Sequence, residues 1–382
     1  MLAAFLIAAA LNLEFEQAYE AAPVITEKIQ SEIDRISEEG GGTLTFKEGL
    51  YKTGALFFKP GVNLRLERGA IIIGSDNPDD YPDMITRIEG ETCVYKPALI
   101  NADRCDNFSI SGKGIIDGHG YPTWVAFWEG RKTDPEFANK TLPRPRLLYV
   151  SNSKNVDVGG VTFRNSKFWT THYYRCENVT VHDCEIIAEV INGVRGPSTD
   201  AIDIDNCRNF TVRKVTMNVN DDAVVVKGGK GPWADDYDKH PENGPTENVL
   251  VENCIFKSIC HSCLTLGSEC PEAYNVVMRN CRMDGSYNLL HLKMRTDTPQ
   301  HYSNVKIENC RGRVKTFVRV KAWKQYENMG DRTWRETISY ADNITVKGCF
   351  IDCDRENAIV RDDKVFRIEK MKFVNNVITT RE

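Results

Sequence analysis

The 382-residue sequence predicts an all-β protein, a right-handed parallel β-helix with a short capping helix near its N-terminus. Two observations lead to this fold class. An Asn followed by an alternating apolar strand recurs at intervals of 23 to 48 residues, and most repeats continue with two further short apolar pieces. Each repeat therefore holds three strands separated by turns. The repeated residue is Asn107, Asn155, Asn178, Asn209, Asn248, Asn275, Asn304 and Asn343.

The repeated Asn has a physical role at a bend between strands. Asn tolerates left-handed backbone, and its amide side chain can hydrogen-bond to the equivalent Asn of the next coil. Helical spacing is absent from the repeats, which argues against a solenoid of helices. The first interval, from Asn107 to Asn155, is interpreted as a double step of the repeat.

The open end of such a solenoid needs a cover, because strand edges and apolar core would otherwise be exposed. The segment 25–42 is predicted to supply it as a helix, with Thr26 as N-cap and Gly40 to Gly42 as its end. We therefore expect one catalytic domain over residues 1–382, with a cap region over about 1–42 and coils over about 43–382. The apolar face of the helix is formed by Ile25, Ile29, Ile33 and Ile36.

Composition and charge exclude some functions. A net charge of −5 argues against a general nucleic-acid binder, and it requires local Lys and Arg for any acidic ligand.

The thirteen cysteines are odd in number and lack zinc-like spacing, so we expect small buried residues stacked from coil to coil, without metal or disulfides. Six of them recur after Asp, Asn or Gly: Cys184, Cys207, Cys254, Cys281, Cys310 and Cys349.

The first residues, Met1 to Leu13, are apolar and resemble the core of a signal peptide. No Lys or Arg precedes them, no clear cleavage site follows, and the stretch is too short to span a membrane. An export signal and a buried N-terminal segment both stay open, and no membrane partner is expected.

Alignment of the third strands of successive repeats brings polar residues together. Ile202 then matches Val224, Leu264 and Leu290, and Ile204 matches Val226, Leu266 and Leu292. Asp200 and Asp222 become equivalent residues of neighbouring coils, roughly 4.8 Å apart. Asp221 and His261 stand one position earlier. By alternation, the outward side chains include Lys227, His291, Lys293 and Arg295.

Three carboxylates and an imidazole in one place suit glycoside hydrolysis. Like charges this close force at least one pKa upward, which keeps one carboxylic acid protonated while another stays ionised to activate water. The alternative is that these aspartates only cap turns, which is common for Asp in loops. The convergence of three acids, a histidine and cations favours the catalytic interpretation.

The chain resembles the glycoside hydrolase family 28 polygalacturonases over nearly its whole length, including GGGTLTF, GKGIIDGHG and FRNSKFWTTH. The family's Asn-Thr-Asp looks like Ser198-Thr199-Asp200, its Asp-Asp like Asp221-Asp222, its Gly-His-Gly like Cys260-His261-Ser262, and its Arg-Ile-Lys like His291-Leu292-Lys293. The resemblance implies an inverting, pectin-degrading hydrolase with a pectin-lyase-like β-helix. It assigns Asp221 as the general acid, Asp200 and Asp222 to water activation, His261 to support of the acid, and Lys293 to a substrate carboxylate.

The main departure from the family pattern is His291 in place of Arg, which removes a bidentate carboxylate clamp. Arg295, on the same outward face, is predicted to compensate. Contacts with an acidic substrate are also considered for Arg131, Lys132 and Arg144.

The insertion 228–248 is predicted to close one end of the cleft, with Trp233 or Tyr237 stacking on a sugar, and so favours exo action. Trp323 and Tyr326 are candidates for a second sugar platform.

The expected ligand is thus an acidic pectic polysaccharide or oligosaccharide, and the expected location is secreted or periplasmic. No metal spacing or nucleotide motif is present, so no cofactor is expected. The alternatives are a rhamnogalacturonan-directed hydrolase, a non-catalytic glycan-binding β-helix and, less favoured, a pectate lyase. Retention of Asp200, Asp221 and Asp222 counts against a mere binding module.

Overall fold

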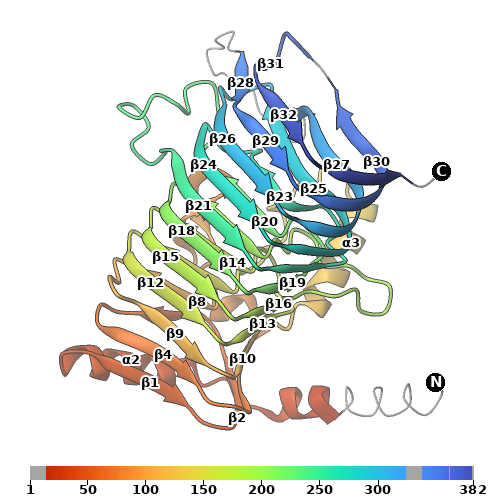
Figure 1. Cartoon of the computed structure of the whole chain (residues 1–382). Coiled ribbons are helices and arrows are strands. Elements are labelled where there is room, and N and C mark those ends of the chain that lie inside the picture. The colour runs from red at the N-terminus through yellow and green to blue at the C-terminus, as the bar shows by residue number, and fades with distance from the viewer. Residues whose placement is uncertain (1–13, 324–337, 361, 381–382) are drawn as a thin grey trace, which may run out of the picture.

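The computed structural model describes residues 14–323, 338–360 and 362–380, and Figure 1 shows them as a stack of coils that rises from the N-terminus. Strands of successive coils pair in parallel with their counterparts above and below. Each regular coil contributes three strands, so the stack has three parallel ladders around one core. The predicted class, an all-β right-handed parallel β-helix with an N-terminal helix, is confirmed.

The first ladder contains the strands that begin at or near the repeated Asn. Its strands are β1 (Gly42–Phe46), β4 (Val62–Leu66), β9 (Ser109–Gly112), β12 (Lys154–Gly159), β15 (Glu177–His182), β18 (Arg208–Arg213), β21 (Thr246–Glu252), β24 (Glu272–Arg279), β26 (His301–Glu308), β28 (Ser339–Asp342), β29 (Ile344–Lys347), β31 (Phe366–Ile368) and β32 (Met371–Val374).

The second ladder is made of short strands that follow the first turn. They are β2 (Gly49–Thr53), β5 (Ala70–Gly74), β10 (Ile115–Asp117), β13 (Thr162–Arg164), β16 (Glu185–Ile187), β19 (Thr216–Asn218) and β22 (Ile255–Lys257).

The third ladder carries the predicted catalytic strands and merges with the second one near the C-terminal end. It runs through β3 (Leu56–Phe58), β8 (Ile100–Asp103), β11 (Leu148–Ser151), β14 (Thr171–Tyr174), β17 (Ile202–Asp205), β20 (Val224–Lys227) and β23 (Ser262–Leu266). The long strands that serve both ladders are β25 (Arg282–Arg295), β27 (Arg311–Trp323) and β30 (Phe350–Ile359), and β33 (Val377–Thr380) pairs with β30.

The repeated Asn residues behave as predicted. All eight have left-handed φ values between 50° and 62°, a region that Asn enters more easily than most residues. Their side chains form a hydrogen-bonded ladder, as where Asn178 Nδ2 donates to Asn155 Oδ1 at 3.1 Å. A column of amides therefore links successive coils along one edge of the stack.

The interpretation of the first interval as a double step is wrong. Asn155 Nδ2 donates directly to Asn107 Oδ1 at 3.1 Å, and β12 pairs with β9, so these two residues belong to adjacent coils. The extra length lies between β10 and β11 and contains helix α3 (Tyr121–Thr133). This helix buries Trp124 and Phe127 but has no regular apolar stripe, which is why helical spacing did not reveal it.

The coils enclose a continuous core of Ile, Leu, Val, Phe and Cys. All thirteen cysteines are free thiols, and all but Cys93 and Cys260 are buried, as predicted for stacked small residues. Helix α2 (Thr26–Glu38) covers the first coil with Ile29, Ile33 and Ile36. Thr26 is not the N-cap, which is Ile25, because the Thr26 hydroxyl instead accepts a hydrogen bond from Gly54 N at 2.7 Å.

Two smaller elements leave the stack between β5 and β8: the 3-10 turn η1 (Pro78–Asp80) and an antiparallel hairpin of β6 (Met84–Ile88) and β7 (Glu91–Tyr95).

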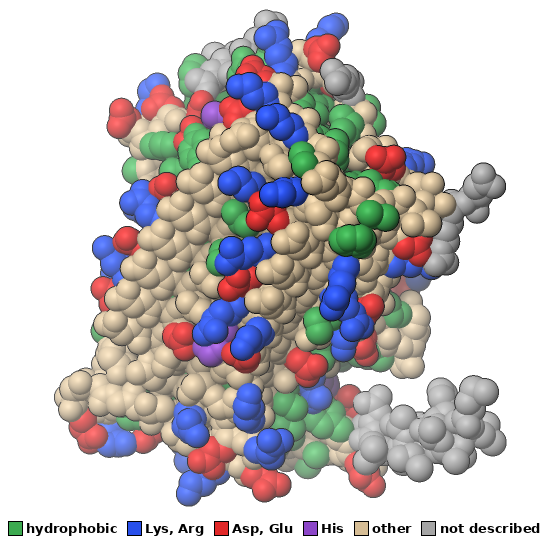
Figure 2. Space-filling model, in the orientation of Figure 1, with side chains coloured by type: hydrophobic (Ala, Val, Ile, Leu, Met, Phe, Trp, Pro, Cys, Tyr) green, Lys and Arg blue, Asp and Glu red, His purple; other side chains and the backbone are tan. Residues whose placement is uncertain are grey.

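On the face seen in Figure 2, Lys and Arg side chains are interspersed with Asp and Glu over the first ladder. That face therefore shows no basic stripe for an acidic polymer. Within the described ranges, no helix combines the length and apolarity that crossing a membrane requires. The segment Met1 to Leu13 lies outside the described residues.

Candidate active site

The register of the third ladder is the one predicted from sequence. Ile202 pairs with Val224, Val224 with Leu264, and Leu264 with Leu290. These apolar residues point into the core, so the residues between them point outward. Ala201 N donates to Asp222 O, and Ala223 N donates to Ser262 O, which continues the same register into the turns before the strands. Asp200 and Asp222 are therefore equivalent residues of adjacent coils.

The three aspartates meet in the turns that precede β17 and β20. The Asp222 amide N donates to Asp200 Oδ1 at 3.1 Å and to Asp221 Oδ1 at 2.9 Å. Asp200 and Asp222 are almost fully buried, whereas the Asp221 side chain is 22% exposed. Asp221 is thus the carboxyl group that a ligand in the groove can reach most easily.

His261 lies one coil further along and pairs with Asp221. Its Nδ1 is 2.7 Å from Asp221 Oδ1, and its side chain is 43% exposed. The Asp221 carboxylate raises the pKa of His261, and this effect outweighs burial. The contact agrees with the alignment of the third strands, which placed Asp221 and His261 at equivalent positions of neighbouring coils.

Lys293 and Thr265 hold Asp222. Lys293 Nζ is 2.6 Å from Asp222 Oδ2, and Thr265 Oγ1 donates to Asp222 Oδ1 at 2.8 Å. Burial alone lowers the pKa of Lys293, but Asp222 and Asp221 raise it, so the lysine carries its charge. Asp222 thus accepts one hydrogen bond from an ammonium group and one from a hydroxyl group, and together they fix the orientation of its carboxylate.

The same cluster contains the group of potential metal ligands found in the described part of the chain. The ligand atoms of Asp221, Asp222 and His261 lie within 4.8 Å of one another. Two of these ligands already have charged partners, because Lys293 neutralises Asp222 and His261 pairs with Asp221. The charge that a divalent cation would supply is already provided by protein cations.

The surroundings of Asp200 and Asp221 shift the pKa values of their carboxyl groups. Burial raises the pKa of Asp200 well above its ordinary value, and the neighbouring Asp221 raises it further. Burial acts in the same direction on Asp221, but His261 outweighs it and lowers the Asp221 pKa, with help from a hydrogen bond to Asp200. The pKa values of this coupled pair are thus shifted in opposite directions, that of Asp200 upward and that of Asp221 downward. The family resemblance assigned the acid role to Asp221, and this role requires Asp221 to gain a proton from the pair.

The predicted substrate-binding residues on β25 occupy different environments. His291 is buried, with Nδ1 3.5 Å from Ser262 Oγ and its ring edge-on to Trp323 at 5.8 Å between centroids. Burial and the nearby Lys293 hold the pKa of His291 well below its usual range, so the imidazole is neutral. Neutral His291 lacks the charge of the Arg that it replaces.

Arg295 does lie on the outward side, but protein carboxylates already engage it. Its Nη2 is 2.5 Å from Asp297 Oδ2, and its Nη1 is 3.6 Å from Glu269 Oε1. The side chain is 2% exposed. Its use as a replacement substrate clamp stays a prediction, one that competes with this internal pairing.

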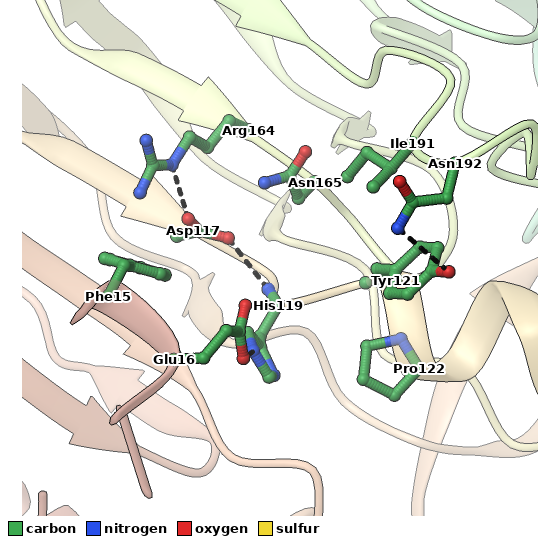
Figure 3. A pocket seen from close by; sticks show the side chains of 11 residues that line it. Phe15, Glu16, Asp117, His119, Tyr121, Pro122, Arg164, Asn165, Ile191 and Asn192 are labelled. Carbon is green, nitrogen blue, oxygen red and sulfur yellow. Dashed lines mark hydrogen bonds and ion pairs between the residues drawn. The ribbon is translucent and has the colours of Figure 1, made fainter. Parts of the chain in front are cut away.

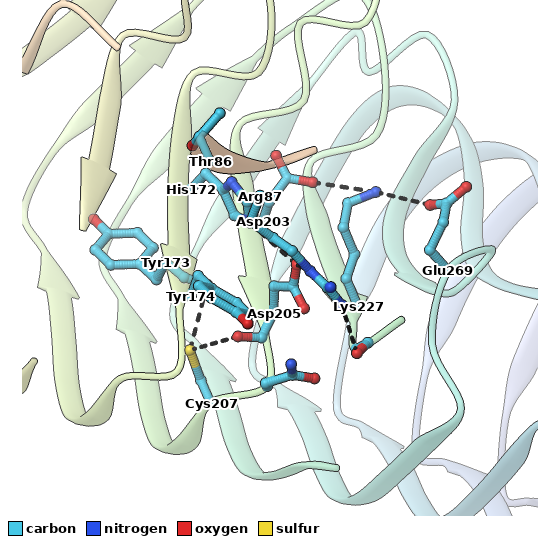
Figure 4. A network of polar contacts seen from close by, with 12 residues as sticks. Thr86, Arg87, His172, Tyr173, Tyr174, Asp203, Asp205, Cys207, Lys227 and Glu269 are labelled. Carbon is cyan, nitrogen blue, oxygen red and sulfur yellow. Dashed lines mark hydrogen bonds and ion pairs between the residues drawn. The ribbon is translucent and has the colours of Figure 1, made fainter. Parts of the chain in front are cut away.

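The β6–β7 hairpin packs over the outward side of the third ladder, which sequence analysis did not anticipate. Figure 4 shows Arg87 of β6 above the third ladder, where its Nε lies 3.2 Å from Asp205 Oδ2. Arg87 also donates to Gly228 O and to Asn243 Oδ1, at the two ends of the insertion. Lys227 bridges Asp203 at 3.5 Å and Glu269 at 3.4 Å. Arg87 thus joins the hairpin and the insertion to β17, beside the ion pairs of Lys227.

The sequence signal for this cover was weak. The buried charges come from four separate segments, and only their pairing explains why Arg87, Asp203 and Asp205 are completely buried. Burial raises the pKa of Asp203 to about 7, against the effect of Lys227.

The aromatic side chains of the insertion have protein partners. Tyr237 donates to Glu272 Oε2 at 2.8 Å, and Trp233 lies under Lys239 Nζ at 5.4 Å. Trp233 also lines a cavity of about 520 Å³ between the insertion and β7.

Arg144, considered for substrate contact, is fully buried between Phe127 and Phe168 and donates to Pro197 O, which is a structural role. Tyr326 lies outside the described residues.

A cavity of about 670 Å³ lies away from the aspartates, at the junction of the N-terminal helical segment and α3 (Figure 3). Its polar wall contains His119, whose Nδ1 is 2.8 Å from Asp76 Oδ2 and whose Nε2 is 3.2 Å from Glu16 Oε2. Tyr19 stacks on the His119 ring at 3.7 Å. These contacts attach residues 14–21 to the coils.

The fold is a parallel β-helix, and its site gathers carboxyl groups of the kind that glycoside hydrolysis uses. The sequence model of glycosyl hydrolases family 28 matches residues 83–358, which include every residue of the cluster. The chain belongs to this family, as its motifs predicted.

Relatives within the family carry polygalacturonase names. A probable polygalacturonase of Vitis vinifera is 25% identical over 245 residues, which are 63% of this chain and 46% of the relative. An exo-poly-alpha-D-galacturonosidase of Dickeya chrysanthemi is 26% identical over 285 residues, 64% of this chain and 44% of the relative. The chain spans less than half the length of these two curated relatives.

Solved structures agree on the fold. An exopolygalacturonase from Thermotoga maritima superimposes with a TM-score of 0.68 at 21% identity, covering 94% of this chain and 88% of the other. A polygalacturonase from Erwinia carotovora gives a TM-score of 0.67 at 19% identity, with 92% and 94% covered.

Proposed function

We propose that this protein hydrolyses α-linked galacturonic acid residues of pectin and releases them from a chain end. The observation that carries the proposal is the cluster of Asp200, Asp221 and Asp222 with His261 and Lys293. It provides a carboxyl group whose pKa is raised, a carboxylate paired with a lysine, and a cation for an acidic ligand. Membership of a family whose relatives bear polygalacturonase names supports this substrate class.

In the proposed mechanism, Asp221 protonates the leaving oxygen, because it is the most accessible of the three carboxyl groups. The proton comes from the pair formed with Asp200. Asp222, fixed by Lys293 and Thr265, and Asp200, once it has given up its proton, activate the attacking water. Direct displacement by that water inverts the anomeric configuration.

Exo action is supported by the cover over the third ladder. Arg87 of the hairpin bonds to the insertion beside buried Asp203, Asp205 and Lys227, so we expect a polymer to be blocked on this side of the predicted catalytic strands. The chain end of the substrate would lie against this cover, and the rest of the polymer would leave over β25 and β27. A polymeric pectic substrate also supports a secreted or periplasmic location.

The test is product analysis by anion-exchange chromatography after incubation with polygalacturonic acid. Galacturonate monomer alone at the earliest times is the expected result, and a ladder of oligomers would instead show an open, endo-acting groove. Neutral His291 favours a second candidate, hydrolysis beside a rhamnose residue. No product from polygalacturonic acid, together with cleavage of rhamnogalacturonan, would select that candidate.

A further inference from the structure

Beyond the aspartate cluster, the outward side of the third ladder carries a group of cations that no family motif assigns. In the ladder between β25 and β27, His291 pairs with Arg319 and Lys293 pairs with Lys321. Side chains two residues apart on a strand share a face, so Arg319 and Lys321 point outward like their partners. The two new cations therefore stand one coil beyond His291 and Lys293, roughly 4.8 Å along the groove.

Trp323 joins these cations into one site. Lys293 Nζ lies 4.7 Å and Lys321 Nζ lies 5.0 Å from the centre of its ring. The Trp323 ring also meets the edge of His291. Arg319, Lys321 and Trp323 are each partly exposed, so a ligand in the groove can reach them.

The site lacks a balancing negative charge in the part of the chain that the structure describes. Lys293 is paired with Asp222, but no ion pair is found there for Arg319 or Lys321. The pKa of Lys321 is lowered by burial and then by Arg319 and Lys293, which is the effect of cations that repel one another. An anion placed among them would relieve this repulsion.

We propose that Arg319 and Lys321 bind the carboxylate of the acidic sugar on the open side of the cleaved bond, in place of the Arg that His291 replaces. The carboxylate clamp is thus displaced by one coil, from β25 to β27. This inference rests on the proposed function, since it takes a uronic acid chain as the ligand. It also accounts for a neutral, buried residue at position 291 in a site for an acidic polymer.

The experiment measures binding, so that it does not depend on turnover. Trigalacturonate and its fully methyl-esterified form are titrated calorimetrically into the Asp221→Asn protein, with and without the added substitutions Arg319→Gln and Lys321→Gln. The parent should prefer the free acid by about tenfold or more, and the two substitutions should remove most of that preference, because charge-assisted hydrogen bonds are lost.

Arg311→Gln, an exposed arginine on the same strand, is the matched control and should keep the preference. Thermal unfolding of each variant checks that it is folded. An undiminished preference in the Arg319→Gln, Lys321→Gln protein overturns the proposal, as does a parent that binds neither trisaccharide. The proposed function is tested by a different result: it fails if the unsubstituted protein releases no product from polygalacturonic acid, even when the two substitutions remove the preference for the free acid.

Discussion

His261 Nδ1 lies 2.7 Å from Asp221 Oδ1, and these two side chains are the most exposed charged groups of the aspartate cluster. The pair joins two adjacent coils, since His261 precedes β23 as Asp221 precedes β20. Burial acts to raise the pKa of Asp221, but His261 outweighs it and lowers that pKa, whereas burial raises the pKa of Asp200. A substrate oxygen that approaches this pair meets the acid and its supporting cation together.

The first prediction concerns Asp221→Asn. Loss of general acid catalysis should reduce kcat on polygalacturonic acid by roughly 10²- to 10⁴-fold, with little change in KM. Asp157→Asn serves as the control, because Asp157 also faces a histidine, His182 at 3.3 Å, but on the first ladder. A reducing-sugar assay measures both, and a mild effect at Asp221 would mean that another residue is the acid.

The second prediction concerns pH. The raised pKa of Asp200 means that its proton is retained above the ordinary aspartate value of 3.8, so kcat/KM should decline only at higher pH, as that proton is lost. Asp200→Asn removes the ionisation and should lower kcat by about 10²-fold or more at all pH values. The measurement is the pH profile of kcat/KM for both proteins. An alkaline limb near pH 4 in the unsubstituted protein would contradict the assignment of the proton.

The third prediction tests the asparagine ladder. Asn209 donates to Asn178 Oδ1 at 3.1 Å and accepts from Asn248 Nδ2 at 3.0 Å, with φ of 57°. Asn209→Ala should lower the free energy of unfolding by about 1–3 kcal/mol, because it loses the hydrogen bonds and strains the backbone. Asn209→Gly relieves the strain and should recover part of the loss. Equal stability of both variants with the unsubstituted protein in urea unfolding would show that the ladder adds no stability.

The fourth prediction concerns His119. Burial lowers the pKa of His119, but Asp76 and Glu16 raise it above 6.5, so the protonated form stabilises the fold. That contribution is present in full below the pKa of an unfolded histidine, and it is lost as pH rises through the higher folded value. Relative to His119→Gln, the unsubstituted protein should gain thermal stability at pH 5 and lose this advantage by pH 9. The same difference at both pH values would contradict the ionic role.

Much of the site could be predicted from the sequence alone, because equivalent residues of successive repeats become neighbours in a coil of parallel strands. The repeated Asn fixed where each coil begins, and the alternation of Ile202, Val224 and Leu264 fixed which side chains face the core. The proximity of Asp200, Asp221, Asp222, His261 and Lys293 followed from that register alone. The coil that contains α3 was misjudged, because an insertion lengthens an interval without adding a rung.

The sequence by itself thus determined the three-ladder β-helix, the burial of most cysteines and the membership of the aspartate cluster. Only the tertiary structure decided that the β6–β7 hairpin packs over the third ladder, and that Arg295 faces Asp297 and Glu269. It also decided that the pKa values of Asp200 and Asp221 are shifted in opposite directions. The physical reason is that periodic backbone pairing is local and repeats along the chain. The burial of a charge depends instead on loops that arrive from distant coils, and their arrangement leaves no period in the sequence.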